Sequence, residues 1–294
     1  MPYELYEIPL GIHTIIRAFR KDQKMKRQSP YVLPSGNVLI SFSGGRTSGY
    51  MLKQILDAND GLPDRAKVVF ANTGREMPET LDFVQECSDR WAVPITWLEY
   101  TRRDNKVGYE VVSHNSASRN GEPLHKLFVS RSYLPNIMQR FCTQEAKVKT
   151  IKRHLASIGW KHWTNTVGIR ADENQRVKSS TDKRWTNWFP LADANVSKRD
   201  VMEFWSAQPF DLRVKLGGGN CDGCFLKSEA TLAMMWREHP ERMQWWADME
   251  AEIGSSFHKS RTFAELGSFV ERQQDWIFND EAYLCQKDDG ECTG

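Results

Sequence analysis

Short apolar runs alternate with stretches of helical spacing in the first hundred residues of the chain. Residues 38–42, 67–71 and 95–100 are apolar runs of strand length. Between them, residues 49–58 and 78–91 carry apolar side chains at helical intervals, and the second stretch opens with Pro, Glu and Thr, a composition typical of a first helical turn. Strands that alternate with helices are typical of a parallel sheet covered by helices. We therefore predict an α/β fold with a Rossmann-like parallel sheet and helices on both faces.

The rest of the chain divides into a loop-rich segment and further helices. From residue 101 to residue 140 the sequence becomes polar, with Gly and Asn, and predicts loops around a site. The same criteria predict helices at 144–158, 197–206 (with Ser197 as the N-cap), 228–238 and 241–253, and a strand at 163–169. We predict an N-terminal extension over residues 1–35, an α/β domain over 36–224, and a helical C-terminal region over 225–294 that ends in a cysteine-containing tail.

Composition and charge narrow the class of protein. The 294 residues are 40% hydrophobic and 27% charged, and no apolar run approaches the roughly 18 residues that span a bilayer. The N-terminal residues lack the pattern of an export signal. We therefore expect a cytoplasmic protein with no membrane partner. The net charge of +2 does not by itself indicate a nucleic-acid partner, but basic residues gather in segments 17–27 and 140–161, which are either solvated surfaces or contacts for an anion.

Six cysteines in a chain without an export signal are expected to be reduced thiols. Cys221 and Cys224 form a C-x-x-C motif directly after a run of glycines, and Cys142 lies earlier in the chain. By itself this motif is compatible with a redox pair, half of a zinc site or half of an iron–sulfur site.

The sequence SFSGGRTS, residues 41–48, joins the first predicted strand to the first predicted helix. Ligands of parallel α/β sheets collect where strands end, and glycines there let backbone N–H groups surround an anion at a helix N-terminus. The spacing is neither that of a Walker A loop nor G-x-G-x-x-G. A structural turn that needs two glycines is the alternative interpretation.

Three segments in order resemble one superfamily. SFSGGRTS resembles the S-G-G-x-D-S pyrophosphate loop of adenine-nucleotide α-hydrolases, ANTGREMPETLDFV (71–84) resembles the D-T-G-x-x-x-P-E-T segment of phosphoadenylyl-sulfate (PAPS) reductases, and VGIRADENQR (167–176) resembles an arginine-bearing loop of the same family. The resemblance implies an α-hydrolase-like domain that binds an adenine nucleotide, either PAPS, adenylyl sulfate (APS) or ATP. The nucleotide-binding residues that it implies are Ser41, Ser43, Gly44, Gly45, Arg46, Thr47, Ser48, Asn72, Thr73, Gly74, Arg75, Gly168, Arg170 and Arg176.

Two positions depart from the motifs of the family. Thr47 stands where the pyrophosphate loop usually has Asp, and Asn72 stands where the reductases have the Asp of D-T-G. Both departures remove a carboxylate that could assist a metal–ATP mechanism. Arg46 adds a guanidinium that is suited to bidentate contact with phosphate or sulfate.

The resemblance also implies a metal cofactor. Family members that act on APS bind a [4Fe-4S] cluster through an early Cys-Cys pair and a later C-x-x-C. Here the early pair is Phe-Cys, so only Cys142, Cys221 and Cys224 correspond. Cys285 is the fourth ligand we predict, with Cys292 as the alternative, whereas Cys87 is expected to be a core thiol. Two further alternatives are a zinc site closed by four thiolates and a cluster with one iron left open for sulfide.

The last residues resemble the mobile Glu-Cys-Gly-Leu-His tail of the reductases in their Glu291-Cys292 pair, although the histidine is missing. This implies Cys292 as a nucleophile and a thioredoxin-like thiol donor as a partner. The function we predict is reduction of PAPS or APS. The alternatives are ATP-dependent thiolation of tRNA or DNA, with a separate sulfur donor, and a non-catalytic protein that binds a nucleotide.

Overall fold

A six-stranded mixed sheet forms the centre of the computed structural model, which describes residues 29–215, 219 and 221–273. The strands are β1 (Val38–Phe42), β2 (Ala66–Asn72), β3 (Ile95–Arg103), β4 (Lys106–Val112), β5 (Trp163–Thr166) and β6 (Trp185–Trp188). Their order in the sheet is β4-β3-β2-β1-β5-β6, and every pair is parallel except β3 and β4. The predicted Rossmann-like α/β fold is confirmed, with an antiparallel edge strand that the sequence pattern did not predict.

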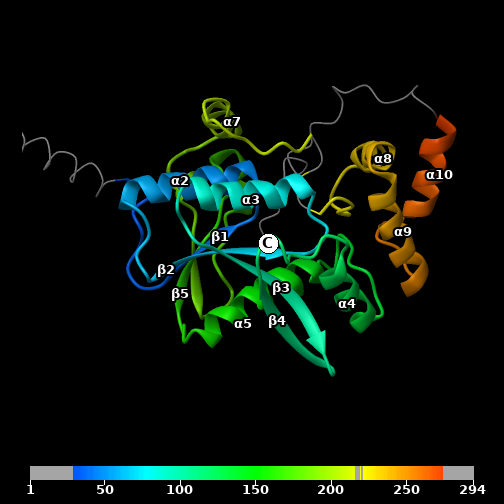
Figure 1. The fold of residues 1–294 in the computed structure, drawn as a ribbon, viewed down its shortest axis with the longest axis horizontal. Helices are drawn as coiled ribbons and strands as arrows, with labels where there is room; N and C mark the ends of the chain where they lie inside the picture. The colour runs from blue at the N-terminus through cyan, green and yellow to red at the C-terminus, as the bar shows by residue number, and fades with distance from the viewer. Residues whose placement is uncertain (1–28, 216–218, 220, 274–294) are drawn as a thin grey trace, which may run out of the picture.

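Helices cover both faces of the sheet, as predicted (Figure 1). Helices α2 (Arg46–Asn59), α3 (Pro78–Arg90) and α7 (Lys198–Ser206) lie on one face, and α4 (Glu122–Arg131), the π-helix η1 (Thr143–Lys149) and α5 (Thr150–Ser157) lie on the other. Short helices η2 (Ala171–Arg176) and α6 (Pro190–Asp193) connect the last strands to α7. Because side chains alternate along a strand, Ile40 packs with α2 and α3 in one core cluster while its neighbour Leu39 packs with Leu155 of α5 in another.

Several local predictions are confirmed and one is wrong. Ser197 caps α7, and its side chain accepts a hydrogen bond from the backbone N–H of Asp200. The predicted helix 144–158 is present but is divided into η1 and α5. The segment 101–140 is not all loop, because it contains the end of β3, the whole of β4 and α4.

The C-terminal part of the described chain is helical, as predicted, and packs directly on the α/β domain. It comprises α8 (Glu229–Glu238), α9 (Pro240–Ile253) and α10 (Phe263–Gln273). Leu232, Met243 and Phe263 from these helices share one buried cluster with Leu124 and Phe128 of α4. The helical part therefore packs on α4 and lies on the side of the molecule toward which β3 and β4 project (Figure 1).

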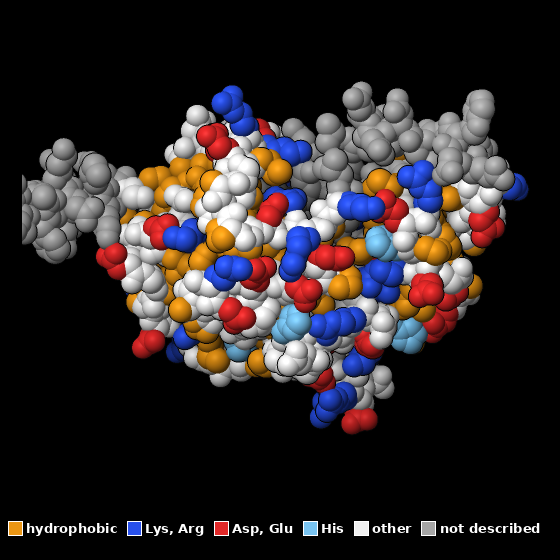
Figure 2. All heavy atoms as spheres, turned by 45° about the horizontal axis from the view of Figure 1, so that its top comes forward, with side chains coloured by type: hydrophobic (Ala, Val, Ile, Leu, Met, Phe, Trp, Pro, Cys, Tyr) orange, Lys and Arg blue, Asp and Glu red, His pale blue; other side chains and the backbone are white. Residues whose placement is uncertain are grey.

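The surface is mixed in charge on the face drawn in Figure 2, where Lys and Arg side chains alternate with Asp and Glu. In the described parts of the chain, no helix combines the length and the apolar character needed to cross a bilayer.

Candidate nucleotide and cysteine site

The loop between β1 and α2 leads into the N-terminus of a helix, and Gly44, Gly45, Thr47 and Ser48 are buried. Gly44 has φ +81°, and a Cβ there would approach the Thr80 methyl group to 2.7 Å. Gly45 is the N-cap of α2, and no side chain caps this helix. The first backbone N–H groups of α2 are therefore oriented as in sites that bind phosphate.

Ser43 and Ser48 fix the shape of this loop. The backbone N–H of Ser43 donates to Ser48 Oγ over 3.2 Å, and Ser48 Oγ donates to the Gly45 carbonyl over 2.9 Å. The Ser43 hydroxyl lies 3.0 Å from the Ser48 hydroxyl. The two serines therefore hold the turn, and this leaves backbone groups rather than side chains to contact an anion.

A cavity lies beside this loop at the carboxyl ends of β1, β2 and β5. Its lining is mostly apolar, with hydroxyl, amide and ammonium groups at a few points, which suits a purine and its sugar. The lining residues are Ser41, Phe42, Ser43, Val69, Ala71, Thr143, Lys147, Val148, Ile151, Asn165 and Val167. Of the predicted nucleotide-binding residues, Ser41 and Ser43 line it directly, and Ser41 Oγ donates to Asn165 Oδ1 over 2.8 Å.

A second cavity brings together cysteines from distant parts of the chain. Its lining residues are Thr73, Leu124, Phe128, Pro135, Cys142, Thr143, Lys147, Cys221, Cys224, Phe225 and Trp246. The three predicted metal ligands in the described part of the chain therefore face one space. Thr143 and Lys147 line both cavities, so the cysteine cavity adjoins the candidate nucleotide cavity.

The cysteines are not arranged around a single point. Within residues 29–215, 219 and 221–273, no three His, Cys, Asp or Glu side chains approach closely enough to hold one metal ion. Ligands of one tetrahedral zinc ion lie about 3.8 Å apart, because each Zn–S bond is about 2.3 Å. In a [4Fe-4S] cluster each thiolate binds a different iron, so its donors lie farther apart. Three thiols that line one cavity are a set of donors that a cluster of this kind uses.

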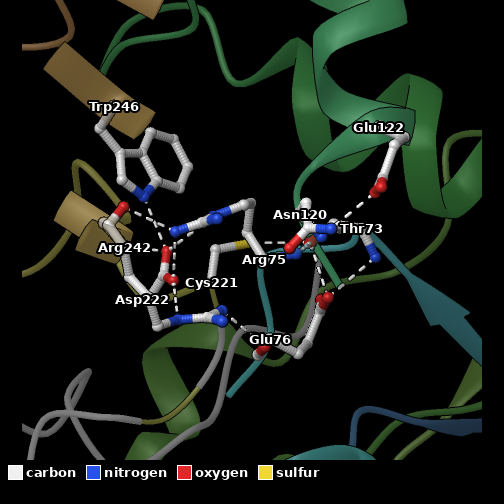
Figure 3. Close-up of polar contacts among 10 residues, drawn as sticks. Thr73, Arg75, Glu76, Asn120, Glu122, Cys221, Asp222, Arg242 and Trp246 are labelled. Atoms are coloured by element: carbon white, nitrogen blue, oxygen red, sulfur yellow. Dashed lines mark hydrogen bonds and ion pairs between the residues drawn. The ribbon is translucent and has the colours of Figure 1, made fainter. Parts of the chain in front are cut away.

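Cys221 is held beside the loop that follows β2 (Figure 3). Its Sγ lies 3.2 Å from Thr73 Oγ1, and the same hydroxyl donates to Glu76 Oε2 over 2.8 Å. Lys147 Nζ lies 3.7 Å from Glu76 Oε1. Burial raises the pKa of Cys221 well above that of an ordinary thiol, Glu76 adds to this rise, and Lys147 opposes it. Binding of a metal by this sulfur therefore requires loss of a proton.

Two of the predicted nucleotide-binding arginines are paired with carboxylates from distant segments. Arg46 makes a bidentate pair with Asp211, with both distances at 2.8 Å. Arg75 is only 3% exposed and pairs with Asp222, inside the C-x-x-C motif, over 2.7 Å. Neither arginine lines the candidate nucleotide cavity.

The third motif segment, residues 167–176, packs against the first, residues 41–48. Arg170 is 1% exposed, and its Nη1 donates to Thr47 Oγ1 over 3.0 Å. Gly168 lies against the start of α2, since a Cβ there would be 3.6 Å from Ser48 Cα. Arg176 pairs with Glu173 of the same loop. The first and third motif segments therefore contact each other.

Asn72 has a structural partner that the sequence pattern did not reveal. Its Nδ2 donates to Glu99 Oε1 over 2.6 Å and to the Ser118 carbonyl over 2.9 Å, and its Oδ1 accepts from the Gly74 N–H over 3.1 Å. Glu99 is 5% exposed and also accepts from the backbone and side chain of Ser118. An amide at position 72 therefore complements a buried carboxylate.

Sequence reasoning overlooked Glu76, Asp222 and Asn165, all of which are part of or adjoin the two cavities. Asp222 lies inside the C-x-x-C motif and Glu76 inside the P-E-T segment, so the motifs marked their neighbourhood but not their role. Cys87 is fully buried in the core, as predicted. Cys285 and Cys292 lie outside the described residues, so the fourth ligand and the nucleophile stay predictions.

Comparison with known proteins gives one family and several similar chains. The sequence matches the profile of the "Phosphoadenosine phosphosulfate reductase domain" over residues 37–212. It is 30% identical over 208 residues to the "Uncharacterized nin region protein ORF290" of Escherichia phage lambda, a match that covers 68% of this chain and 69% of the phage protein.

Two solved structures are similar to this chain, each with a TM-score of 0.42. The phosphoadenylyl-sulfate reductase of Candida auris, in a phosphate complex, has a TM-score of 0.42 at 16% identity and covers 71% of this chain and 92% of its own. The U34-tRNA thiolase NcsA of Methanococcus maripaludis, with its [4Fe-4S] cluster, has a TM-score of 0.42 at 11% identity and covers 94% of this chain and 88% of its own. At these values the two structures carry no information on the reaction of this chain.

Proposed function

Because the chain belongs to the phosphoadenosine phosphosulfate reductase domain family, we propose that it binds an adenine nucleotide and performs sulfur chemistry on it beside an iron–sulfur cluster. The observation that carries the proposal is the pair of adjoining cavities, one at the strand ends and one lined by three cysteines, which share Thr143 and Lys147. A nucleotide in the first cavity would have its reactive end close to the second.

Nucleotide binding would use backbone groups more than arginines. The N-terminus of α2 supplies N–H donors and the positive end of a helix dipole for a phosphate or sulfate. Lys147 adds an ammonium group between the two cavities. Arg46 and Arg75 would need to leave Asp211 and Asp222 to contact the same anion, so we assign them a supporting role.

Cys142, Cys221 and Cys224 would hold the cluster, with Cys285 as the fourth ligand when Cys292 is the nucleophile. When bound, a [4Fe-4S] cluster supplies a redox-active group of negative charge. Lys147 would offset part of that charge, because it lines the same cavity as the three thiols. Reduced thiols require a reducing compartment, so the proposal includes a cytoplasmic location.

The reaction that we favour is reduction of PAPS or APS. The Cys292 thiolate would attack the sulfur of the sulfonucleotide, the S–O bond to the phosphate would break, and the adenosine phosphate would leave. A dithiol such as thioredoxin would then attack the resulting S-sulfonate, release sulfite with the two electrons of the S–S bond, and become a disulfide. The residues of this chain bind and orient the nucleotide for that attack.

The metal assignment has a direct test in three proteins reconstituted without oxygen. Iron, sulfide and zinc content and the visible spectrum are measured for the natural protein, Cys221→Ala and Cys87→Ala. We expect broad charge-transfer absorption in the natural protein and in Cys87→Ala, because that thiol lies in the core, away from the cavity. Loss of the absorption only in Cys221→Ala supports the assignment, whereas colourless protein that contains zinc contradicts it.

The reaction is tested with PAPS and APS, each with thioredoxin and its reductase. Sulfite and the matching adenosine phosphate are the expected products, in equal amounts. Tight nucleotide binding without any product would favour a non-catalytic role.

ATP-dependent thiolation of a nucleic acid is a second candidate, and one surface favours it. The segment 126–153, which borders the cysteine cavity, contains seven Lys or Arg residues against one Glu. Ile137 and Met138 in the same segment are 68% and 82% exposed. Basic and apolar side chains together suit contact with a polyanion that exposes bases. Cleavage of ATP that depends on added tRNA or DNA, with no sulfite from PAPS, would favour this candidate.

A further inference from the structure

A buried carboxylate lies inside the C-x-x-C motif and belongs to neither cavity. Asp222 is fully buried and pairs with two arginines, Arg75 over 2.7 Å and Arg242 over 2.6 Å (Figure 3). The Trp246 indole N–H donates to Asp222 Oδ1 over 2.7 Å, and the Gly223 backbone N–H donates to the same oxygen over 2.8 Å. Both carboxylate oxygens are therefore fully hydrogen-bonded.

The contacts of Asp222 join three separate segments of the chain. Arg75 belongs to the loop after β2, and Arg242 and Trp246 belong to α9. Asp222 itself belongs to the loop that carries Cys221 and Cys224, which we call the cysteine loop. The backbone joins two of these segments, because the Asp222 N–H donates to the Arg75 carbonyl over 2.8 Å. Glu76 and Cys221 form an isolated antiparallel bridge next to this bond.

Each of the two arginines also donates a hydrogen bond to a backbone carbonyl in the segment of the other. Arg75 Nη2 donates to the Arg242 carbonyl over 2.7 Å, and Arg242 Nη2 donates to the Glu76 carbonyl over 2.9 Å. The Arg75 guanidinium also lies 4.8 Å from the ring centre of Trp245. Movement of the cysteine loop therefore requires that the loop after β2 and α9 move with it.

We propose that Asp222 is a positioning residue that fixes the C-x-x-C loop against the loop 72–76 and thereby couples ligand binding at one to the order of the other. The coupling half rests on the proposed nucleotide site, because the loop 72–76 carries one of the three nucleotide motifs. The positioning half stands on the contacts alone.

The burial of the Asp222 carboxylate is explained better by the geometry of its hydrogen bonds than by a contribution to the stability of the protein. A buried ion pair contributes little net stability compared with apolar residues of the same size, because removing both charges from water has a large cost. Its hydrogen bonds are directional, however, and here they define the relative position of three segments. Such a connection with a defined arrangement is one way to couple two sites energetically.

Hydrogen exchange of the metal-free protein tests the positioning half. Asp222→Asn keeps the shape of the side chain and removes its charge. We expect exchange in a peptide over residues 221–226 to become at least about tenfold faster, because a charged hydrogen bond of this kind is lost. Peptides from β1 and α2 should be unchanged. Unchanged exchange at 221–226, or equal acceleration throughout the protein, would overturn the proposal.

Two further variants keep the test decisive if Asp222→Asn folds poorly. Trp246→Phe removes the indole N–H donor to Asp222 and keeps an aromatic ring, although a smaller one, so we expect a smaller acceleration, about threefold, in the same peptide. Glu110→Gln is the matched control, because it removes a carboxylate of β4 that pairs with Arg103 at the end of β3, in another part of the fold. Acceleration at 221–226 in this control as large as in Trp246→Phe would contradict a specific role for Asp222.

Adenosine 3′,5′-bisphosphate is the probe for the coupling half. In the natural protein we expect it to slow exchange in peptides over both 72–76 and 221–226. In Asp222→Asn it should protect 72–76 alone, and equal protection of both peptides in that variant would overturn the coupling. If the probe protects neither peptide in the natural protein, the nucleotide site fails, and with it the coupling. The comparison without ligand still decides the positioning role.

Discussion

Replacing Asn72 with Asp restores the residue found in the reductase motif and, in this structure, should destabilise the protein. Asn72 Nδ2 donates to Glu99 Oε1 over 2.6 Å and to the Ser118 carbonyl over 2.9 Å. An ionised Asp has no donor for either acceptor, and it places a second negative charge against Glu99. Both side chains are buried, so water screens this repulsion little.

Protonation of one carboxyl group limits how far Asn72→Asp can lower the free energy of unfolding. One of the two carboxyl groups can bind a proton and donate it to the other, which restores one hydrogen bond. Holding an Asp of ordinary pKa about 3.9 protonated at pH 7 costs about 4 kcal/mol, at about 1.4 kcal/mol for each unit. The donor to Ser118 is lost in either case, at about 1–3 kcal/mol. Together these costs set a ceiling of about 5–7 kcal/mol on the loss in the free energy of unfolding that we expect for Asn72→Asp at pH 7.

The sign of the pH dependence separates this explanation from simple loss of packing. The carboxyl pair in the folded variant binds a proton more tightly than the unfolded chain does, so the deficit in stability shrinks as the pH falls. Between about pH 7 and about pH 5 the deficit should decrease by up to about 2.7 kcal/mol.

Urea denaturation of the natural protein, Asn72→Asp and Asn72→Ala at several pH values measures these quantities. Asn72→Ala loses the same hydrogen bonds without adding a charge, so its deficit should not depend on pH over this range. A deficit in Asn72→Asp that is absent, or that has the same pH dependence as the Ala variant, would refute the reasoning.

Three further changes test other parts of the site. Gly223→Ala places a Cβ against the indole ring of Trp246, so we expect a loss of about 1–3 kcal/mol in the free energy of unfolding, measured in urea. The pKa of Glu145 lies below its ordinary value of 4.5 because the surrounding cations outweigh the opposing effect of burial. Its contribution to stability is therefore present above that value and is lost as the pH falls through the lowered pKa, so the stability difference between the natural protein and Glu145→Gln should shrink on acidification. Lys147→Met should weaken binding of adenosine 3′,5′-bisphosphate by about 10–100-fold in calorimetry, whereas Lys106→Met, on the β3–β4 hairpin, should leave it unchanged.

The position of the loop between β1 and α2 follows from local pattern. Strand β1, the glycines after it and helix α2 are contiguous in sequence, and each is indicated by periodicity or by a turn residue. Strand β4 is local too, but it lies at the edge of the sheet and its side chains are half-buried or exposed. It therefore lacks the apolar run that marked the central strands, and the sequence indicated a loop in its place.

The sequence motif indicated part of the cysteine cavity, and the topology of the fold decided the rest. The C-x-x-C spacing marked Cys221 and Cys224 as a pair, but the approach of Cys142 depends on η1 packing against the loop after β2. Residue separation along a chain does not determine distance in space, so only the fold decides whether three thiols face one cavity.

The arginines show most clearly what tertiary structure decides. Their number and positions in the motifs were readable from the sequence, and they indicated contact with an anion. In the structure, Arg46 and Arg75 pair with Asp211 and Asp222, which are more than a hundred residues away. A guanidinium binds whichever carboxylate folding brings within reach, and sequence pattern records the charges but not the long-range contacts that pair them.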